Sequence, residues 1–199
     1  MKKHDLLIVG VGGQGIILAS DILGEAAITA GYEVKKTDTL GMAQRGGSVV
    51  SHVRIASQVW SPLIKEGEVD ILVAFEKLEA ARWSYYLRPG GLAIINNQAM
   101  PPLSVSLGTQ RYPSDKEIKE LFKSLTDRFI LIEGTNQAKE MGDIRTLNMI
   151  MLGCISYFVP IDDKIWKDCI SQHLSPKILQ TNLTAFDMGR EETSSANLG

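Results

Sequence analysis

Six residues near the start of the chain, Gly10-Val11-Gly12-Gly13-Gln14-Gly15, constrain its fold more than any other segment. They follow the apolar run 6–9 and precede a stretch, 16–30, in which apolar or small residues recur at helical spacing. A strand, a glycine loop matching G-x-G-x-x-G and a helix form an anion site, because the glycines admit a ligand and the helix presents free N–H groups. A tight turn without any ligand explains the same glycines, so both interpretations stay open.

The rest of the chain alternates short apolar runs with helical patterns, which indicates an α/β fold. Further strands are predicted at 33–37, 49–55, 71–75, 92–95 and 129–132, and further helices at 77–87, after the capping box Ser114-x-x-Glu117, and at 144–158, 162–173 and 176–190. The glycine-rich link between the second and third strands is too short for a crossover helix, so part of the sheet is expected to be antiparallel.

We therefore predict a three-layer α/β/α Rossmann-like sheet, mostly parallel, with a helical C-terminal segment. One domain is expected over 1–190 and a flexible, polar tail over 191–199. Pro89-Gly90-Gly91 is predicted as a turn, and the proline-containing stretch 98–113 as a loop with a short strand near Val105.

Composition narrows the class of protein. The chain has 199 residues, of which 44% are hydrophobic and 22% charged, so a folded domain with a real core is expected. A net charge of -2 provides no basic surface for nucleic acid or an anionic membrane. Cys154 and Cys169 are too few to hold a cysteine-ligated iron–sulfur cluster or a four-cysteine zinc. The run 6–9 is too short for a signal peptide or a membrane span, and a cytoplasmic protein is expected.

A second glycine motif, Gly41-Met42-Ala43-Gln44-Arg45-Gly46-Gly47, separates two predicted strands. Its glycines permit positive φ and close approach to a ligand or a partner, and the planar guanidinium of Arg45 suits a phosphate or a carboxylate. A solvated loop with a surface arginine explains the same residues. Gln44, Arg45, Gly46 and Gly47 are therefore candidate contacts beside Gly10, Gly12, Gly13, Gln14 and Gly15.

Three acidic or amide side chains follow predicted strands. Asp38, at the end of the second strand, occupies the place of the ribose-binding acid of a dinucleotide fold. Glu76 and Asn96 follow later strands, at the edge where open α/β sheets bind ligands. A helix-dipole role for Glu76 and a turn at Asn96 are alternatives without a ligand. We find no catalytic motif and predict no catalytic or metal-binding residue.

The two glycine motifs together resemble the gamma subunit or gamma domain of 2-oxoacid:ferredoxin oxidoreductases. The resemblance extends over almost the whole chain, through Asp70-Ile71-Leu72-Val73-Ala74-Phe75-Glu76, Leu87-Arg88-Pro89-Gly90-Gly91, Asn148-Met149-Ile150-Met151-Leu152-Gly153, and Lys177, Asn182, Ala185, Phe186 and Gly189. One departure is visible: the family often has His and Ser where this chain has Leu40 and Ala43. Within the family, a free-standing chain of this size is most similar to the indolepyruvate branch, with the pyruvate, 2-oxoglutarate and 2-oxoisovalerate branches as close alternatives.

The resemblance implies a division of labour. It implies a larger alpha subunit that carries thiamine diphosphate and [4Fe-4S] clusters, and ferredoxin as the electron acceptor. This chain would then supply structure and contacts to coenzyme A, and it would hold no tightly bound cofactor of its own. A homodimer is expected when the chain is isolated. The alternatives are a stand-alone Rossmann-type oxidoreductase that binds NAD(P) through Asp38, and a scaffold module that has lost its complex.

Overall fold

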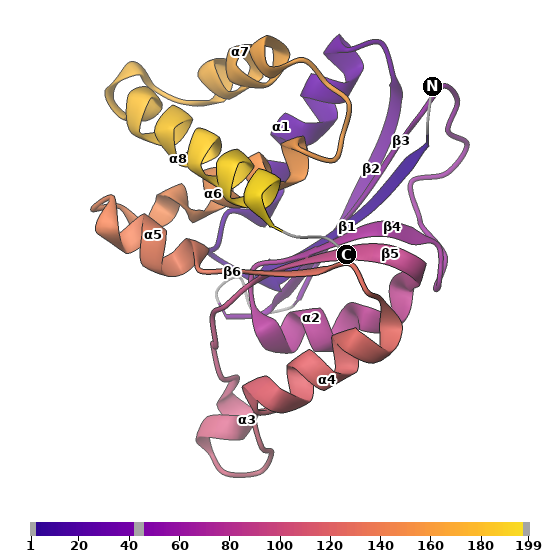
Figure 1. Cartoon of the computed structure of the whole chain (residues 1–199), viewed down its shortest axis with the longest axis vertical. Coiled ribbons are helices and arrows are strands. Elements are labelled where there is room, and N and C mark those ends of the chain that lie inside the picture. Colours follow the sequence, from indigo (N-terminus) through magenta and orange to yellow (C-terminus); the bar gives the residue numbers. More distant parts are fainter. Residues whose placement is uncertain (1–2, 42–45, 197–199) are drawn as a thin grey trace.

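The computed structural model describes residues 3–41 and 46–196, which build a six-stranded sheet in the order β2-β3-β1-β4-β5-β6 (Figure 1). The strands are β1 (His4–Val11), β2 (Glu33–Leu40), β3 (Ser48–Ala56), β4 (Val69–Ala74), β5 (Leu87–Asn96) and β6 (Phe129–Ile132). β1, β4, β5 and β6 pair in parallel, whereas β3 runs antiparallel to both β1 and β2. The sheet is thus mostly parallel, with β3 against the general direction, as predicted.

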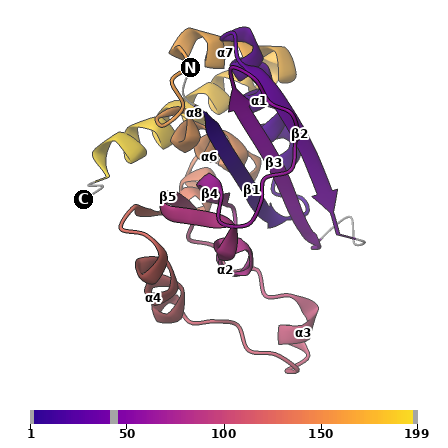
Figure 2. The ribbon, with the colours of Figure 1, turned by 90° about the vertical axis from the view of Figure 1, so that its right-hand side faces the viewer.

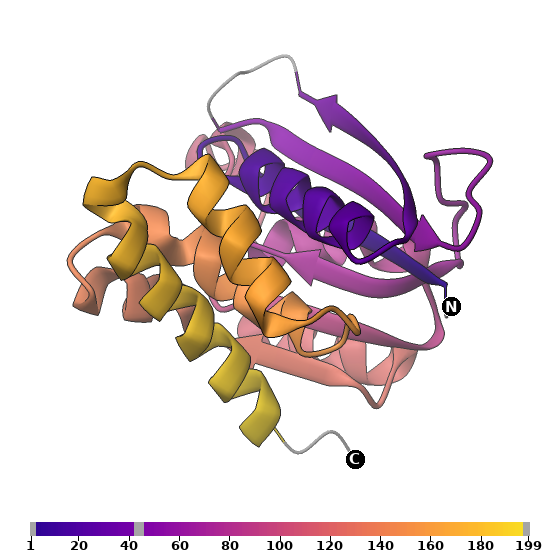
Figure 3. The ribbon, with the colours of Figure 1, turned by 90° about the horizontal axis from the view of Figure 1, so that it is seen from above.

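Helices cover both faces of the sheet, which confirms the three predicted layers (Figure 1). One face carries α1 (Ile16–Thr29), α5 (Gly134–Glu140), α6 (Leu147–Ser156), α7 (Asp163–His173) and α8 (Pro176–Ser195), with the 3-10 turn η2 (Ile144–Thr146) before α6. The other face carries α2 (Lys77–Trp83), the 3-10 turn η1 (Ser84–Tyr86) and α4 (Asp115–Leu125). Seen from above, α1, α7 and α8 lie over the sheet (Figure 3), whereas the short helix α3 (Leu103–Ser106) projects away from it (Figure 2).

The central strand β1 explains why its apolar run is continuous. Leu6 and Ile8 are fully buried in the core under α1 and α6, and Leu7 and Val9 are fully buried in the core on the side of α4. Because successive side chains of a strand point to opposite faces, a strand covered on both faces needs apolar residues at every position. The run 6–9 is such a strand.

The ends of the parallel strands align beside the glycine loop. Val9 pairs with Ala74, and Ala74 pairs with Ile95, in the register of β1, β4 and β5. The next residues along these strands therefore come close together at one edge of the sheet. This register places Gly10, Phe75 and Asn96 side by side, which is the arrangement that builds the site described below.

Several sequence-based expectations differ from the structure. Pro89-Gly90-Gly91 lies inside β5, at an irregularity in its pairing with β4, and Gly90 has φ +68°. The region near Val105 is the helix α3, which follows the two prolines at its N-terminus. α5 was not predicted, because its sequence Gly-Thr-Asn-Gln-Ala-Lys-Glu has almost no apolar periodicity. α8 continues to Ser195 and buries Thr193, so the segment 191–195 is helical rather than a flexible tail.

Within the described residues, no helix combines the length and the apolar character that a membrane crossing requires.

Candidate ligand-binding site

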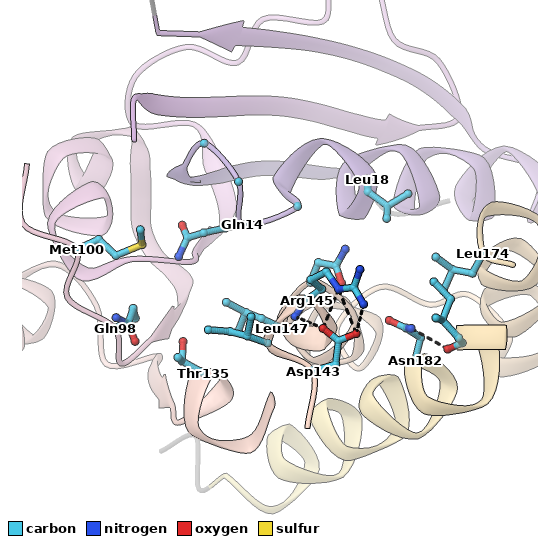
Figure 4. A pocket seen from close by; sticks show the side chains of 16 residues that line it. Gln14, Leu18, Gln98, Met100, Thr135, Asp143, Arg145, Leu147, Leu174 and Asn182 are labelled. Carbon is cyan, nitrogen blue, oxygen red and sulfur yellow. Dashed lines mark hydrogen bonds and ion pairs between the residues drawn. The ribbon is translucent and has the colours of Figure 1, made fainter. Parts of the chain in front are cut away.

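A cavity of about 580 Å³ opens where the glycine loop meets the C-terminal helices (Figure 4). Its walls come from four parts of the chain: the loop and α1, the connection 97–102 between β5 and α3, the segment from α5 to α6, and the junction of α7 with α8. Figure 4 shows Gln14, Gln98 and Met100 towards one end, Asp143 and Arg145 in the middle, and Leu174 and Asn182 at the other end. The site therefore needs residues that are far apart in the sequence.

The two glycine motifs meet through their backbones. The N–H of Gly12 donates to the carbonyl oxygen of Gly47 at 2.8 Å, and the N–H of Gly46 donates to the carbonyl oxygen of Gly12 at 3.4 Å. These bonds continue the antiparallel pairing of β1 with β3, which ends at Val11 and Ser48. The loop that lines the cavity is therefore fixed by the second motif. Gln44 and Arg45 lie outside the described residues.

Close packing requires glycine at two positions of the loop. A Cβ on Gly10 would lie 2.9 Å from the Cβ of Phe75, so the strand ends could not come as close with any larger residue. Gly15 has φ +81° and directly precedes α1, and no side chain caps this helix. The first N–H groups of a helix have no partner within it, and they carry its partial positive charge. The cavity thus has an uncapped helix N-terminus on its wall.

Gln14 holds the loop rather than pointing freely into the cavity. Its Oε1 accepts from the N–H of Val11 at 2.7 Å, and its Nε2 donates to the carbonyl oxygen of Phe75 at 3.0 Å. Gln14 still lines the cavity. Its amide, however, is committed to positioning the glycines.

Asn148 lines this cavity with a side-chain oxygen that no described residue satisfies. It lies on α6, it is only 7% exposed, and its Oδ1 has no hydrogen-bond partner. Its Nδ2 approaches Gly15, because a Cβ added there would lie 2.7 Å from this nitrogen. Buried polar atoms are normally hydrogen-bonded, so an unpaired amide oxygen beside a cavity indicates a site for a ligand or a water.

The charged side chains of the described lining, Asp143 and Arg145, form an ion pair with each other. Arg145 donates from Nε and Nη2 to the carboxylate of Asp143 at 2.6–3.1 Å, and the Asp143 carboxylate also accepts from the backbone N–H of Arg145. These hydrogen bonds hold the pKa of Asp143 below its usual range. The Arg145 side chain is 80% exposed, so its guanidinium remains accessible to solvent. Leu18, Leu174 and Ile178 add an apolar wall.

Two predicted site residues, Glu76 and Asn96, are buried and satisfied by the protein. Glu76 caps α2, where its Oε2 accepts from the N–H of Glu79 at 2.8 Å. Asn96 donates to the carbonyl oxygen of Phe75 at 2.9 Å and to Oγ1 of Thr135 at 2.8 Å, and it accepts from the N–H of Thr135. Neither side chain lines the cavity, although Thr135 does. Both therefore support its walls.

Asp38 does not occupy the position of a ribose-binding acid. In a dinucleotide fold the second strand lies beside the first, whereas here β3 is inserted between β1 and β2. Asp38 accepts a hydrogen bond from Ser51 Oγ at 2.6 Å and forms an ion pair with Lys36 at 2.9 Å. It is absent from the cavity lining. The expectation that it contacts a cofactor is not supported by its placement, and its described partners lie in β2 and β3.

Sequence reasoning missed the half of the site that comes from the C-terminal helices. Asn148 and Asn182 were noted only as part of the family resemblance, and Ile144, Arg145 and Ile178 were not singled out. A signal was present: Asn148 is the second residue of a buried helix whose other residues are apolar or small, and a polar amide in such a helix needs a reason.

The described residues do not fit an iron–sulfur cluster. Cys154 and Cys169 are both buried and unpaired, and burial raises the pKa of the Cys154 thiol to about 12. In 3–41 and 46–196, no three or more His, Cys, Asp or Glu side chains gather in a way that could hold a metal ion. We therefore derive no chemistry through a cluster on this chain.

Comparison with known proteins identifies the family. The model of the pyruvate ferredoxin/flavodoxin oxidoreductase family matches residues 5–192. The chain is 37% identical over 192 residues, 95% of each chain, to the indolepyruvate oxidoreductase subunit IorB of Pyrococcus horikoshii. The chain also covers 99% of the keto/oxoacid ferredoxin oxidoreductase gamma subunit of Geobacter sulfurreducens, over 97% of its own length, with a TM-score of 0.72 and 24% identity.

A longer protein contains the same fold. The 2-oxoglutarate:ferredoxin oxidoreductase of Magnetococcus marinus, solved with 2-oxoglutarate, coenzyme A and succinyl-CoA bound, matches the whole of this chain with a TM-score of 0.77 and 23% identity. This chain spans 32% of that protein's length. These two structural likenesses show the fold, and the matches over nearly the full sequence show that the chain belongs to the pyruvate ferredoxin/flavodoxin oxidoreductase family.

Proposed function

We propose that this chain is the small subunit of an indolepyruvate:ferredoxin oxidoreductase. The observation that carries the proposal is the 37% identity to an IorB subunit over 95% of both chains. In the proposed reaction the carbon–carbon bond to the carboxylate breaks and releases CO2, and the thiol sulfur of coenzyme A forms a thioester with the former keto carbon. Two electrons pass to two oxidised ferredoxins, and the thiol proton is released, so that atoms and electrons balance.

The proposal assigns the redox chemistry to a larger alpha subunit. That partner would carry thiamine diphosphate, on which the 2-oxoacid is decarboxylated, and the [4Fe-4S] clusters that pass electrons to ferredoxin. Support comes from the buried, unpaired state of Cys154 and Cys169 in this chain. Without its partner the chain is expected to be inactive and to form a homodimer, which sedimentation of the isolated chain would detect.

The cavity is the proposed site of coenzyme A. Its uncapped helix at Gly15 offers N–H groups to a phosphate, and the amide of Asn148 offers hydrogen bonds to a polar group. The apolar wall of Leu18, Leu174 and Ile178 suits the less polar part of such a ligand. When bound, coenzyme A supplies the thiol that accepts the acyl group. The role of this chain's residues is to bind and orient it, and Gln44 and Arg45 are proposed as further contacts.

The enzyme assay uses the chain co-produced with the proposed large subunit. Reduction of ferredoxin is measured with indolepyruvate, pyruvate, 2-oxoglutarate and 2-oxoisovalerate, each with and without coenzyme A. We expect indolepyruvate to give the highest kcat/KM, and we expect either subunit alone to be inactive. A higher kcat/KM with one of the other three acids would contradict the indolepyruvate assignment and would place the chain in that branch.

Two variants test the coenzyme A site in the same complex. Gly12→Asp places a negative charge in the glycine loop, and Arg45→Ala removes a proposed phosphate partner. Both are expected to raise the KM for coenzyme A while the KM for indolepyruvate stays the same. Lys123→Ala, in the last turn of α4 on the opposite face of the sheet, serves as the control for a lost surface cation. Unchanged coenzyme A KM values in both variants would refute this part of the proposal.

A further inference from the structure

We propose that Glu76 is a positioning residue, whose buried carboxylate, held by Tyr112, fixes the connection 97–102 as one wall of the cavity and thereby sets the affinity of the cavity for its ligand. The inference rests on the proposed function for the identity of that ligand, coenzyme A. Glu76 itself does not line the cavity, whereas Gln98 and Met100 of the connection do. Its effect would therefore be transmitted through the backbone of the connection.

The carboxylate of Glu76 gathers three donors from three parts of the chain. Its side chain is almost completely buried, with 1% of the residue exposed. Oε2 accepts from the N–H of Glu79 in α2, and Oε1 accepts from the N–H of Met100 at 3.0 Å and from the hydroxyl of Tyr112. A buried carboxylate with this many donors is held in one geometry, since losing a donor would leave one of its acceptor positions buried and unsatisfied.

The sequence makes the bond to Met100 hard to replace. Pro101 and Pro102 follow it, and proline has no backbone N–H. Met100 therefore supplies the last backbone donor before Leu103. Two residues earlier, the carbonyl oxygen of Gln98 accepts from the N–H of Lys77 at 3.0 Å. The two cavity-lining residues of the connection are thus fastened to the consecutive residues 76 and 77.

Tyr112 lies near the end of the segment 97–114, which connects β5 to α4, and it binds the same carboxylate. The chain leaves β5, forms α3, which projects from the body of the protein (Figure 2), and returns before α4. The hydroxyl of Tyr112 accepts from the N–H of Leu78 at 3.2 Å and donates to Glu76. Burial and the neighbouring Glu76 raise the pKa of Tyr112 well above its usual range, so the phenol keeps its proton. Glu76 therefore holds this segment near both of its ends, at Met100 and at Tyr112.

The backbone carbonyl of the neighbouring residue Phe75 holds two other walls of the cavity, independently of the Glu76 side chain. Its carbonyl oxygen accepts from Gln14 at 3.0 Å and from Asn96 at 2.9 Å, which hold the glycine loop and the N-terminus of α5. Substitution of the Glu76 side chain leaves this carbonyl in place. The effect of a Glu76 variant should therefore be confined to the connection 97–102 and to α2.

The test uses Tyr112→Phe and Glu76→Gln. Amide hydrogen exchange on the isolated chain reports the connection without any ligand, and we expect the N–H of Met100 to exchange roughly tenfold faster in both variants. In the complex we expect the KM for coenzyme A to rise about tenfold in Glu76→Gln and less in Tyr112→Phe, with kcat within about twofold of the wild type. Asp162→Asn, which weakens the cap of α7, and Tyr157→Phe, at an exposed tyrosine directly after α6, are the matched controls. Neither should change exchange at Met100 or the KM.

The outcomes separate the inference from the proposed function. Unchanged exchange at Met100 in both variants would overturn the inference, whatever the ligand. Faster exchange with an unchanged KM for coenzyme A would also overturn it, because the wall would then not set affinity. If the wild-type complex shows no dependence on coenzyme A, the proposed ligand is wrong, and the exchange result alone decides whether Glu76 positions the wall.

Discussion

Gly15 and Asn148 lie against each other at the side of the cavity, so closely that a Cβ on Gly15 would fall 2.7 Å from Nδ2 and 3.0 Å from Cβ of Asn148. The first residue ahead of α1 and the second residue of α6 are therefore packed as a unit. Glycine at position 15 serves two requirements at once, a left-handed backbone with φ +81° and this close approach. The uncapped helix N-terminus and the unsatisfied amide are brought together by it.

Gly15→Ala is expected to destabilise the protein more than Gly13→Ala. Both positions have positive φ, which costs a residue with a side chain about 1–2 kcal/mol. A Cβ on Gly13 meets nothing within 4 Å, whereas one on Gly15 displaces Asn148. Urea unfolding of the two variants compares a position with this contact to one without it, at backbone φ values of +81° and +106°. Equal free energies of unfolding would mean that Asn148 moves aside without cost.

Asn148→Leu should separate stability from ligand binding. Leucine shares the branching of asparagine at Cγ, although it is larger, and it removes an amide oxygen that is buried without a partner. We expect the free energy of unfolding to stay constant or to rise by up to about 1 kcal/mol, because an unsatisfied polar group no longer has to be desolvated. The KM for coenzyme A should rise at the same time. A loss of stability without any change in KM would show that the amide has a structural role only.

Asp38 provides a test of the NAD(P) alternative. Its partners Ser51 and Lys36 lie in β3 and β2, away from the cavity. Asp38→Ala should cost about 1–3 kcal/mol of stability, because it leaves the hydroxyl of the buried Ser51 without its acceptor, and it should leave the activity of the complex unchanged. NAD and NADP are expected not to shift the melting temperature of the isolated chain. A saturable rise in melting temperature with either nucleotide, abolished in Asp38→Ala, would instead restore the dinucleotide interpretation.

Local sequence signals predicted the layers of the fold but not the consequence of its strand order. The short glycine-rich link before β3 correctly indicated an antiparallel strand, because no crossover helix fits there. That same insertion moves β2 one position away from β1 and takes Asp38 out of the site. The expected ribose contact assumed the usual strand order, which no local pattern in the sequence encodes.

The actual roles of Glu76 and Asn96 were not predictable from the sequence, and for both residues the reason is the same. Glu76 and Asn96 were correctly placed at the strand ends, but their donors Met100, Tyr112 and Thr135 come from segments without regular periodicity. Contacts of this kind depend on how irregular segments return to the sheet. For this reason the sequence could indicate that these polar residues matter at the sheet edge, yet not that they support a wall rather than touch a ligand.

The buried His52 should lower the free energy of unfolding in mild acid. It is 5% exposed, and its Nδ1 accepts from the N–H of Ile64 at 3.3 Å. Burial, followed by the charge of Arg54, lowers the pKa of His52 below its usual value of 6.5. Below about pH 6.5 His52 is protonated in the unfolded chain but stays neutral in the folded chain. The free energy of unfolding therefore falls as the pH is lowered from 7 to 5. Urea unfolding at pH 7 and pH 5.5 should show a smaller difference in His52→Phe than in the wild type, and an equal difference would contradict this assignment.

Gly189→Ala is the substitution expected to damage the fold most. α6 and α8 cross so closely that a Cβ on Gly189 would lie 1.9 Å from the carbonyl oxygen of Ile150, and one on Gly153 would lie 2.0 Å from that of Phe186. Backbone atoms cannot rotate away, so the helices must separate, and we expect the free energy of unfolding to fall by about 3 kcal/mol or more.

Gly24→Ala in α1 is the matched control. Its Cβ would meet only Val34, at 3.7 Å, and the substitution should stabilise the helix by about 0.5–1 kcal/mol. Because Asn182 of α8 and Asn148 of α6 both line the cavity, Gly189→Ala should also weaken coenzyme A binding, whereas Gly24→Ala should not.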